Sequence, residues 1–185
     1  MRKTSIINLY GGPGTGKSTS AAFLYYLMKE GGLNVELVRE YVKDWVWEKR
    51  VISNYDQFYL LGKQIRRESM LYDKVDYIVT DSPIFQGLYY ANAYSPEHVK
   101  IGVQAATYAF YKQAQADGHR HYHVFLQRSK PYNPSGRYQT LEEAVEIDRG
   151  IKEMLEKYGM QHIDCSTDQE QLRGLLSAIR SETGV

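Results

Sequence analysis

The stretch GGPGTGKST, residues 11–19, constrains the fold of this chain more than any other part of its sequence. Residues 11–18 fit the pattern G-x-x-x-x-G-K-[ST], and the apolar run that precedes them, residues 6–10, is typical of a strand. Glycines let the backbone turn tightly and direct its N–H groups inward, toward a phosphate at the start of the following helix. The sequence therefore predicts a strand, a phosphate-binding loop and a helix, in that order.

Each residue of this loop has an expected role toward a nucleoside triphosphate and its Mg²⁺. The Lys17 ammonium is expected to reach the β- and γ-phosphates, and the Ser18 hydroxyl is placed to ligate Mg²⁺. The full set of expected nucleotide-binding residues is Gly12, Gly14, Thr15, Gly16, Lys17, Ser18 and Thr19.

Length and composition fit one globular domain spanning residues 1–185. With 43% hydrophobic and 24% charged residues, the chain can bury a sizeable core. It has no apolar run long enough to span a membrane, so no membrane partner is expected, and its single cysteine, Cys165, fits a reducing cytoplasm. The net charge of +1 gives no overall attraction to nucleic acid. The oligomeric state is not predicted, and the protein could be a monomer or a homodimer.

Strand and helix patterns alternate along the chain. Strands are predicted at residues 6–10, 34–39, 75–81, 119–127 and 161–165. Helices are predicted at residues 17–30, at 56–72, and from residue 96, with Ser95 as the cap, to about residue 117. Two more helices are expected to begin at pairs with capping-box spacing, Thr140 with Glu143 and Thr167 with Glu170. This alternation favours an α/β fold in which helices cover both faces of a parallel sheet.

The helix at 56–72 is predicted from apolar residues at helical spacing, namely Phe58, Leu61, Ile65 and Leu71. The same helix carries Gln57 and Gln64, seven residues apart and therefore near one face, with Arg67 close by. An amide side chain can hydrogen-bond to the edge of a base with its donor and its acceptor together, so these glutamines are candidates for substrate binding. It is equally consistent with the sequence that they are ordinary polar residues on the exposed face of the helix.

Ligands of parallel sheets lie at the carboxyl ends of the strands, and two acids follow such ends here. Glu40 comes directly after the second strand and Asp81 closes the third, which places both beside the phosphate loop. Phosphoryl transfer requires that the phosphate charge be neutralised and that a residue orient or deprotonate the acceptor hydroxyl. Glu40 and Asp81 are therefore both candidate catalytic residues. Asp81 is also a candidate ligand of Mg²⁺.

A Pro- and Gly-containing loop follows the fourth strand, at about residues 128–139, and carries Arg128 and Arg137. Cationic segments that close over phosphates compensate the charge of the transition state and exclude water. Arg128 and Arg137 are therefore candidate catalytic residues, with Arg128 also expected to bind the nucleotide and Arg149 of the next helix as a further candidate.

The segments GGPGTGKST, LVREYVKDW, DQFYLLGKQ and VDYIVTDSP resemble the nucleoside-kinase type of P-loop phosphotransferase, and more closely its ribosylnicotinamide-kinase-like branch with an AAA-type ATP-binding domain. The resemblance implies a three-layer P-loop NTPase fold, strand order 2-3-1-4-5, a lid at about 128–139, and ATP with Mg²⁺. It also implies that Glu40 is the base toward the acceptor hydroxyl and that Trp45 lies at the acceptor. The chain departs from the family at Asp81-Ser82-Pro83, where nucleoside kinases carry Glu-Arg-Ser, and Ser135-Gly136-Arg137 matches the lid motif Asp-Gly-x-Arg only approximately.

The run EYVKDWVWEKR, with KQIRRE and TDSP, is also similar to bacteriophage P-loop kinases that phosphorylate 5-hydroxymethyluracil within DNA. That resemblance implies a DNA-modifying enzyme that moves the γ-phosphate of ATP to the 5-hydroxymethyl group of an extruded base. We take this nucleoside-like acceptor in DNA as the first choice. A free nucleoside or nucleotide is the alternative, and a P-loop ATPase without a phosphate acceptor is the second alternative.

Overall fold

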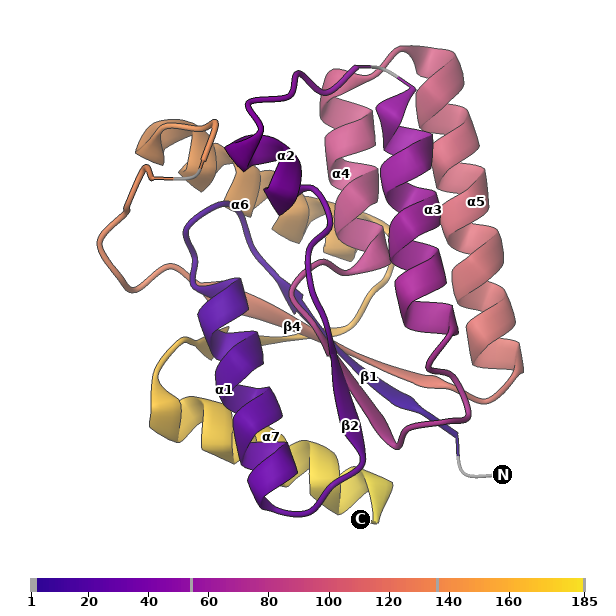
Figure 1. The fold of residues 1–185 in the computed structure, drawn as a ribbon, viewed down its shortest axis with the longest axis vertical. Helices are drawn as coiled ribbons and strands as arrows, with labels where there is room; N and C mark the ends of the chain where they lie inside the picture. Colours follow the sequence, from indigo (N-terminus) through magenta and orange to yellow (C-terminus); the bar gives the residue numbers. More distant parts are fainter. Residues whose placement is uncertain (1–2, 54, 136, 185) are drawn as a thin grey trace.

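A computed structural model describes residues 3–53, 55–135 and 137–184, and it forms one five-stranded parallel sheet with the order β2-β3-β1-β4-β5 (Figure 1). The strands are β1 (Ser5–Tyr10), β2 (Val35–Val38), β3 (Tyr77–Thr80), β4 (Arg120–Gln127) and β5 (His162–Ser166). The expected strand order and parallel pairing are confirmed, and all five strands lie within a few residues of their predicted ranges.

Seven helices are described, and α1 (Lys17–Glu30) has the bounds that the sequence predicts. The others are α2 (Lys43–Trp47), α3 (Asp56–Ser69), α4 (Ile84–Tyr94), α5 (Glu97–Ala116), α6 (Leu141–Lys157) and α7 (Gln169–Thr183). Among these described helices, none combines the length and the apolar character that crossing a bilayer would require.

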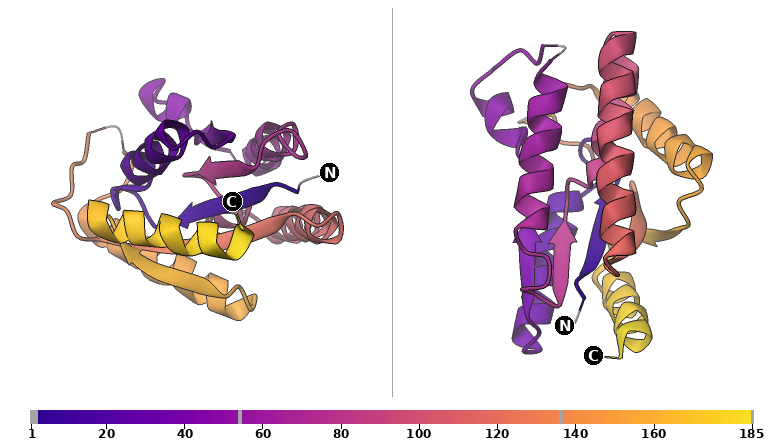
Figure 2. Two further views of the ribbon diagram at one scale, coloured as in Figure 1. Left: turned by 90° about the horizontal axis from the view of Figure 1, so that it is seen from below. Right: turned by 90° about the vertical axis from the view of Figure 1, so that its right-hand side faces the viewer.

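The helices cover both faces of the sheet, as expected, because the strand residues alternate between two cores. On one face, Ile7 and Leu9 of β1 pack in a core with residues of α1 and α7. On the other face, Tyr10 packs with residues of α3, α4, α5 and α6. Figure 2 shows the resulting three layers from two further directions, with α3 and α5 standing side by side.

Two helices were not predicted from the sequence, and one predicted cap is wrong. The sequence patterns predicted no helix at the short α2 or at α4. The capping box of Thr140 and Glu143 is present at the start of α6. At α7, however, the cap is Asp168, whose carboxylate accepts hydrogen bonds from the N–H groups of Glu170 and Gln171, so the predicted Thr167 pairing is wrong.

The buried face of α3 also differs from the predicted one. The buried residues are Gln57, Leu61, Gln64 and Glu68, whereas Phe58 is 40% exposed. These buried residues recur at helical spacing, but three of the four are polar, so apolar periodicity alone predicts the helix and not its orientation. Burial of these polar side chains is a cost that the surroundings of α3 must offset.

Glu68 is the most extreme of these residues, with no exposed surface, and its Oε1 accepts a hydrogen bond from the Tyr72 hydroxyl at 2.6 Å. Burial raises the pKa of Glu68 to about 7 from the ordinary 4.5. Because the folded state binds this proton more tightly than the unfolded chain, the stabilisation is complete below the unfolded pKa and is lost as the pH rises through about 7.

We therefore predict that Glu68→Gln stabilises the protein at pH 8.5 relative to the natural chain, by up to ~3 kcal/mol, and changes its stability much less at pH 5. Urea unfolding at the two pH values measures this difference, with Glu156→Gln, an exposed acid of α6, as the control. An equal effect of Glu68→Gln at both pH values would show that the carboxyl does not titrate in the folded protein near neutral pH.

Candidate active site

The phosphate loop between β1 and α1 has the backbone that an anion site requires. Gly14 and Gly16 have φ values of 78° and 97°, in the left-handed region that favours glycine. Gly16 is the N-cap of α1 and supplies no side-chain hydrogen bond, so the first N–H groups of the helix are left for a ligand. Ser18 and Thr19 are exposed at this helix start.

Lys17 folds back over the loop, where its ammonium donates to the carbonyl oxygens of Gly11 at 2.6 Å and Gly12 at 2.9 Å. Burial lowers the pKa of Lys17, and the nearby carboxylates of Glu40, Asp81 and Asp148 oppose that shift. The ammonium therefore lies where three acids from three separate segments meet.

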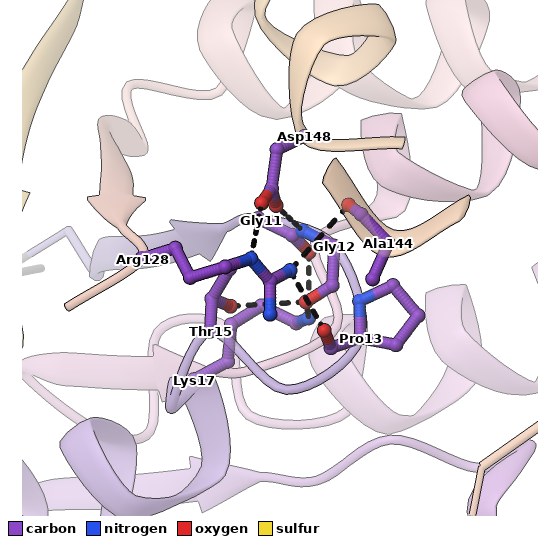
Figure 3. Close-up of polar contacts among 8 residues, drawn as sticks. All are labelled: Gly11, Gly12, Pro13, Thr15, Lys17, Arg128, Ala144 and Asp148. Carbon is purple, nitrogen blue, oxygen red and sulfur yellow. Dashed lines mark hydrogen bonds and ion pairs between the residues drawn. The ribbon is translucent and has the colours of Figure 1, made fainter. Parts of the chain in front are cut away.

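Asp148 of α6 holds the phosphate loop from one side, as Figure 3 shows. One carboxylate oxygen accepts a hydrogen bond from the Gly12 N–H at 2.5 Å, and the other pairs with Arg128 Nε at 2.8 Å. A Cβ on Gly12 would lie 2.7 Å from the Ala144 carbonyl oxygen and 2.8 Å from the Asp148 carboxylate. Sequence reasoning missed Asp148, although it lies four residues after Ala144 and so on the same side of α6, which meets the loop.

Arg128, at the end of β4, completes the contact with the loop. Its Nη2 donates to the Pro13 carbonyl oxygen at 2.8 Å, while its Nη1 is buried without a hydrogen-bond partner in the described structure. A Cβ on Gly14 would lie 3.2 Å from this Nη1 and 2.8 Å from the Tyr132 ring. The guanidinium thus keeps one free donor beside the phosphate loop, as expected for a residue that meets a phosphate.

Glu40 and Asp81 meet at the neighbouring strand ends, as the sequence predicts. The Glu40 N–H donates to the buried Asp81 carboxylate at 2.8 Å. Burial raises the pKa of the Glu40 carboxyl above its usual value, and the Asp81 charge adds to this, while Lys17 opposes it. Burial also raises the pKa of Tyr90 in α4, and the charges of Glu40 and Asp148 add to that shift.

The amide side chains of α3 lie inside the fold rather than on its surface. Gln57 and Gln64 are 9% and 5% exposed, so the exposed-polar explanation is wrong for both. Gln64 Nε2 is 3.4 Å from the Thr80 hydroxyl at the end of β3, directly before Asp81.

Trp45 and Arg67 belong to an aromatic cluster around α2 and α3. The Trp45 ring is buried, stacks on Tyr59 at 5.8 Å between centroids, and has the Arg50 guanidinium 3.6 Å from its centroid. Arg67 donates to the Arg39 carbonyl oxygen and lies 4.8 Å from the Tyr41 ring centroid. Both side chains are therefore engaged within the protein.

Among the described residues, neither Arg137 nor Arg149 makes a hydrogen bond or an ion pair with the phosphate loop, although Arg137 lies 5.5 Å from the centroid of the Tyr132 ring, which borders Gly14. Arg137 donates to the Asn133 carbonyl oxygen of its own loop, and Gly136, part of the approximate lid motif, lies outside the described residues. Arg149 points to solvent and pairs with Glu146. Tyr138 instead connects the 128–139 loop to α2, with its hydroxyl 3.1 Å from the Trp45 carbonyl oxygen and 2.8 Å from that of Arg50.

These donors fit a nucleotide with Mg²⁺. The Ser18 hydroxyl is exposed at the helix start, and Asp81 uses one carboxylate oxygen on the Glu40 amide. Hydroxyl and carboxylate oxygens suit Mg²⁺, which retains waters and binds phosphate oxygens rather than a full protein cage. The described residues contain no group of three or more His, Cys, Asp or Glu side chains that could enclose a metal ion.

The fold and the loop together define a P-loop nucleotide-binding protein. A family model described as an AAA domain matches residues 6–171, and the chain belongs to that family. No protein in a curated set matches its sequence at a significant level.

Among solved structures, the chain is similar to NadR protein in complex with NAD and the ATP analogue AMP-PNP, with a TM-score of 0.71 and 15% identity, covering 98% of this chain and 50% of that one. It is similarly close to NadR protein in complex with NR, with a TM-score of 0.74, 15% identity, and coverage of 98% and 52%. The chain spans about half the length of these proteins, and at this identity the similarity supports the fold.

The close approach of Gly12 to α6 gives a first test of the site. We predict that Gly12→Ala weakens AMP-PNP binding by at least about tenfold, because the added methyl separates the loop amide from Asp148, and a hydrogen bond to a charged group contributes ~1.5–3 kcal/mol. Calorimetric titration measures the affinity. Gly174→Ala in α7, where a Cβ would meet nothing within 4 Å, is the matched control.

Affinity that is unchanged in Gly12→Ala would contradict the assignment of the Gly12–Asp148 contact to the nucleotide site. A drop shared by Gly174→Ala would point instead to a general loss of folded protein.

Proposed function

We propose that this protein is an ATP-dependent kinase that transfers the γ-phosphate to a hydroxyl of a free nucleoside-like acceptor. The observation that carries the proposal is the meeting of Glu40 and Asp81 near Lys17, at the ends of the adjacent strands β2 and β3, on one side of the phosphate loop. A site that only bound a nucleotide would not need a second acid with a raised pKa on the acceptor side of the phosphates.

In the proposed reaction, Glu40 is the general base. Its carboxylate accepts the proton of the acceptor hydroxyl as the hydroxyl oxygen bonds to the γ-phosphorus, and the bond from that phosphorus to the bridging oxygen of ADP breaks. The raised pKa of Glu40 suits this role, because a base is most effective when its pKa approaches the working pH.

The charge of the transferring group is balanced by the loop and by cationic side chains. In this proposal Lys17 leaves the loop carbonyls to meet the β- and γ-phosphates, and Arg128 Nη1, which has no partner and lies 3.2 Å from the position of a Cβ on Gly14, donates to the same phosphates. Ser18 and Asp81 are the residues that would hold Mg²⁺, and the ion would neutralise part of the phosphate charge.

The comparisons support a free nucleoside more than a base in DNA. The similar structures are of NadR protein bound to NAD, AMP-PNP and NR, none of which is a nucleic acid. The DNA acceptor, which was the first choice from the sequence, gains no support from these similarities. It stays the second candidate because exposed aromatic side chains could stack on a base: Trp47 at the end of α2 is 63% exposed, and Tyr55 at the start of α3 is 67% exposed.

A P-loop ATPase is disfavoured by the residue after Asp81. Hydrolytic motors commonly place a glutamate there to activate water, and this chain has Ser82, whose N–H bonds to the Thr80 hydroxyl. The acid in position to act is Glu40, on the neighbouring strand.

The role of Glu40 predicts both the rate and its pH dependence. Glu40→Gln should lower kcat by a factor of ~10² to 10⁴ while AMP-PNP affinity is retained. In the natural protein, kcat/KM should rise with pH as Glu40 loses its proton, with a midpoint above that of an ordinary glutamate, and this acidic limb should vanish in the variant.

Glu48→Gln, at an exposed acid just after α2, is the control and should leave the rate and the profile unchanged. If kcat for Glu40→Gln fell by less than about tenfold with its acidic limb intact, Glu40 could not be the base.

Transfer itself is tested with γ-labelled ATP and a panel of free ribonucleosides, deoxynucleosides, nucleotides, plain DNA and DNA containing 5-hydroxymethyluracil. We predict label on a free nucleoside-type compound. Label on the modified DNA alone would select the second candidate, and labelled inorganic phosphate without any labelled acceptor would identify an ATPase. Lys17→Ala should abolish turnover in every case.

A further inference from the structure

The loop between β4 and α6, residues 128–139, contacts two separate parts of the proposed active site (Figure 1). Near its start, the Tyr132 ring packs against the phosphate loop, where a Cβ on Gly14 would lie 2.8 Å from two ring carbons. Near its end, the Tyr138 hydroxyl lies 3.1 Å from the Trp45 carbonyl oxygen and 2.8 Å from that of Arg50. The loop therefore connects the phosphate loop with α2.

The two contacts of this loop are joined by a hydrogen bond within it. The Tyr132 hydroxyl donates to the Gln139 carbonyl oxygen at 2.6 Å, and Gln139 directly follows Tyr138. Tyr132 thus has its ring on the phosphate loop and its hydroxyl on the backbone beside Tyr138. A displacement of the Tyr132 ring can pass to Tyr138 through this bond, because packed and hydrogen-bonded groups transmit displacements to one another.

The α2 helix depends on such outside support, because its five residues are too few for a helix that is stable by itself. Its end closes at Lys49, which has a φ of 53°, in the left-handed region, and the Arg50 N–H donates to the Trp45 carbonyl oxygen. Carbonyl groups at a helix end lack partners within the helix, and the Tyr138 hydroxyl reaches two carbonyls at and just after the end of α2. Tyr138 therefore stabilises the end of this helix.

The candidate base Glu40 lies close to α2 along the chain, with only residues 41 and 42 between them. The Tyr41 ring meets the Trp45 ring edge to face, with centroids 6.1 Å apart, and its hydroxyl lies 2.9 Å from that of Tyr59 in α3. The Glu40 N–H donates to the Asp81 carboxylate at 2.8 Å. The backbone at Glu40 is therefore held by Asp81 on one side and by the packing of Tyr41 against α2 on the other.

We infer that Tyr138 is a positioning residue that couples nucleotide occupancy of the phosphate loop to α2 and to the segment that carries Glu40. The connection runs from Gly14 to the Tyr132 ring, from the Tyr132 hydroxyl to the backbone beside Tyr138, and from Tyr138 to α2. Its consequence for catalysis rests on the proposed function, because it assumes that Glu40 is the base. The coupling of the nucleotide to α2 requires no turnover.

A bound nucleotide can act on α2 only if it interacts differently with two states of this connection, and Arg128 supplies that difference. Its Nη1 has no partner in the described structure and lies 3.2 Å from the position of a Cβ on Gly14. The same guanidinium lies 5.7 Å from the Tyr132 ring centroid. A phosphate that accepts a hydrogen bond from Nη1 fixes the guanidinium beside the ring, and so favours the state in which Tyr132 and Tyr138 keep their contacts.

Hydrogen exchange of α2, measured by mass spectrometry without AMP-PNP and at saturating AMP-PNP, tests the coupling. The reporters are the N–H groups of Glu48, Lys49 and Arg50, which donate to carbonyl oxygens of α2. We predict that AMP-PNP slows their exchange at least about fivefold in the natural protein, and that this ratio falls toward one in Tyr138→Phe. Tyr132→Phe keeps the ring on Gly14 but removes the bond to Gln139, so it should lose the ratio as well.

Tyr26→Phe is the matched control and should keep the ratio, since Tyr26 is an exposed tyrosine of α1 whose hydroxyl bonds to Glu30 in the same helix. The ratio also separates coupling from a purely structural role. A Tyr138 that only stabilised α2 would, when replaced by phenylalanine, speed exchange equally with and without AMP-PNP, and the ratio would not change.

Exchange of α2 that AMP-PNP does not slow in the natural protein, or a ratio retained in either Tyr138→Phe or Tyr132→Phe, would overturn the inference. Turnover is measured separately. Tyr138→Phe should lower kcat and keep the acidic limb of kcat/KM, because Glu40 is still present, and an unchanged kcat would reject the effect on Glu40. Coupling without phosphate transfer would leave the role of Tyr138 standing and reject the proposed kinase activity, whereas transfer without coupling would do the opposite.

Discussion

The contact between Asp148 and the phosphate loop is the interaction on which the rest of the site depends. The loop itself is a run of glycines, and its backbone is free to adopt other shapes when nothing holds it. Asp148 fixes the Gly12 amide on one oxygen and Arg128 on the other, and Arg128 in turn holds the Pro13 carbonyl. The anion-binding shape of the loop is thus held by α6 and by the end of β4, both more than a hundred residues away along the chain.

Parallel strand order explains why the catalytic candidates meet. With β1 in the centre and β3 then β2 beside it, the ends of these strands bring the phosphate loop, Asp81 and Glu40 to one edge of the sheet. Burial raises the pKa of Glu40 and lowers that of Lys17, and the attraction between these two opposite charges opposes both shifts. A charged site of this kind is costly to bury when empty, and a bound nucleotide with its cation would offset part of that cost.

Local signals in the sequence predict much of this architecture. Gly16 and Gly31 flank α1, so the first and last residues of this helix could be predicted from the sequence. The predicted ends of β2 and β3 also brought Glu40 and Asp81 together, as the structure shows. What could not be predicted depends on tertiary packing. Asp148 is one of several acids in α6, and only its neighbours in space distinguish it from the exposed Glu153.

The buried face of α3 has the same origin. Its apolar residues indicated one orientation, but the helix turns its glutamines and Glu68 inward, where Gln64 meets the Thr80 hydroxyl and Glu68 accepts a hydrogen bond from Tyr72. The α4 helix escaped prediction because IFQGLYYANAY contains a glycine and an asparagine and lacks a clear polar face.

Coupling between Arg128 and Asp148 is the most direct test of the arrangement that holds the nucleotide site. A double-mutant cycle with Arg128→Ala, Asp148→Ala and the double variant, measured on AMP-PNP affinity, isolates the interaction of the two side chains. If the two act as one unit on the loop, the second substitution should cost little after the first, with a coupling of at least ~1 kcal/mol. Losses that simply add would show that each residue acts alone, and would contradict the view that α6 shapes the phosphate loop.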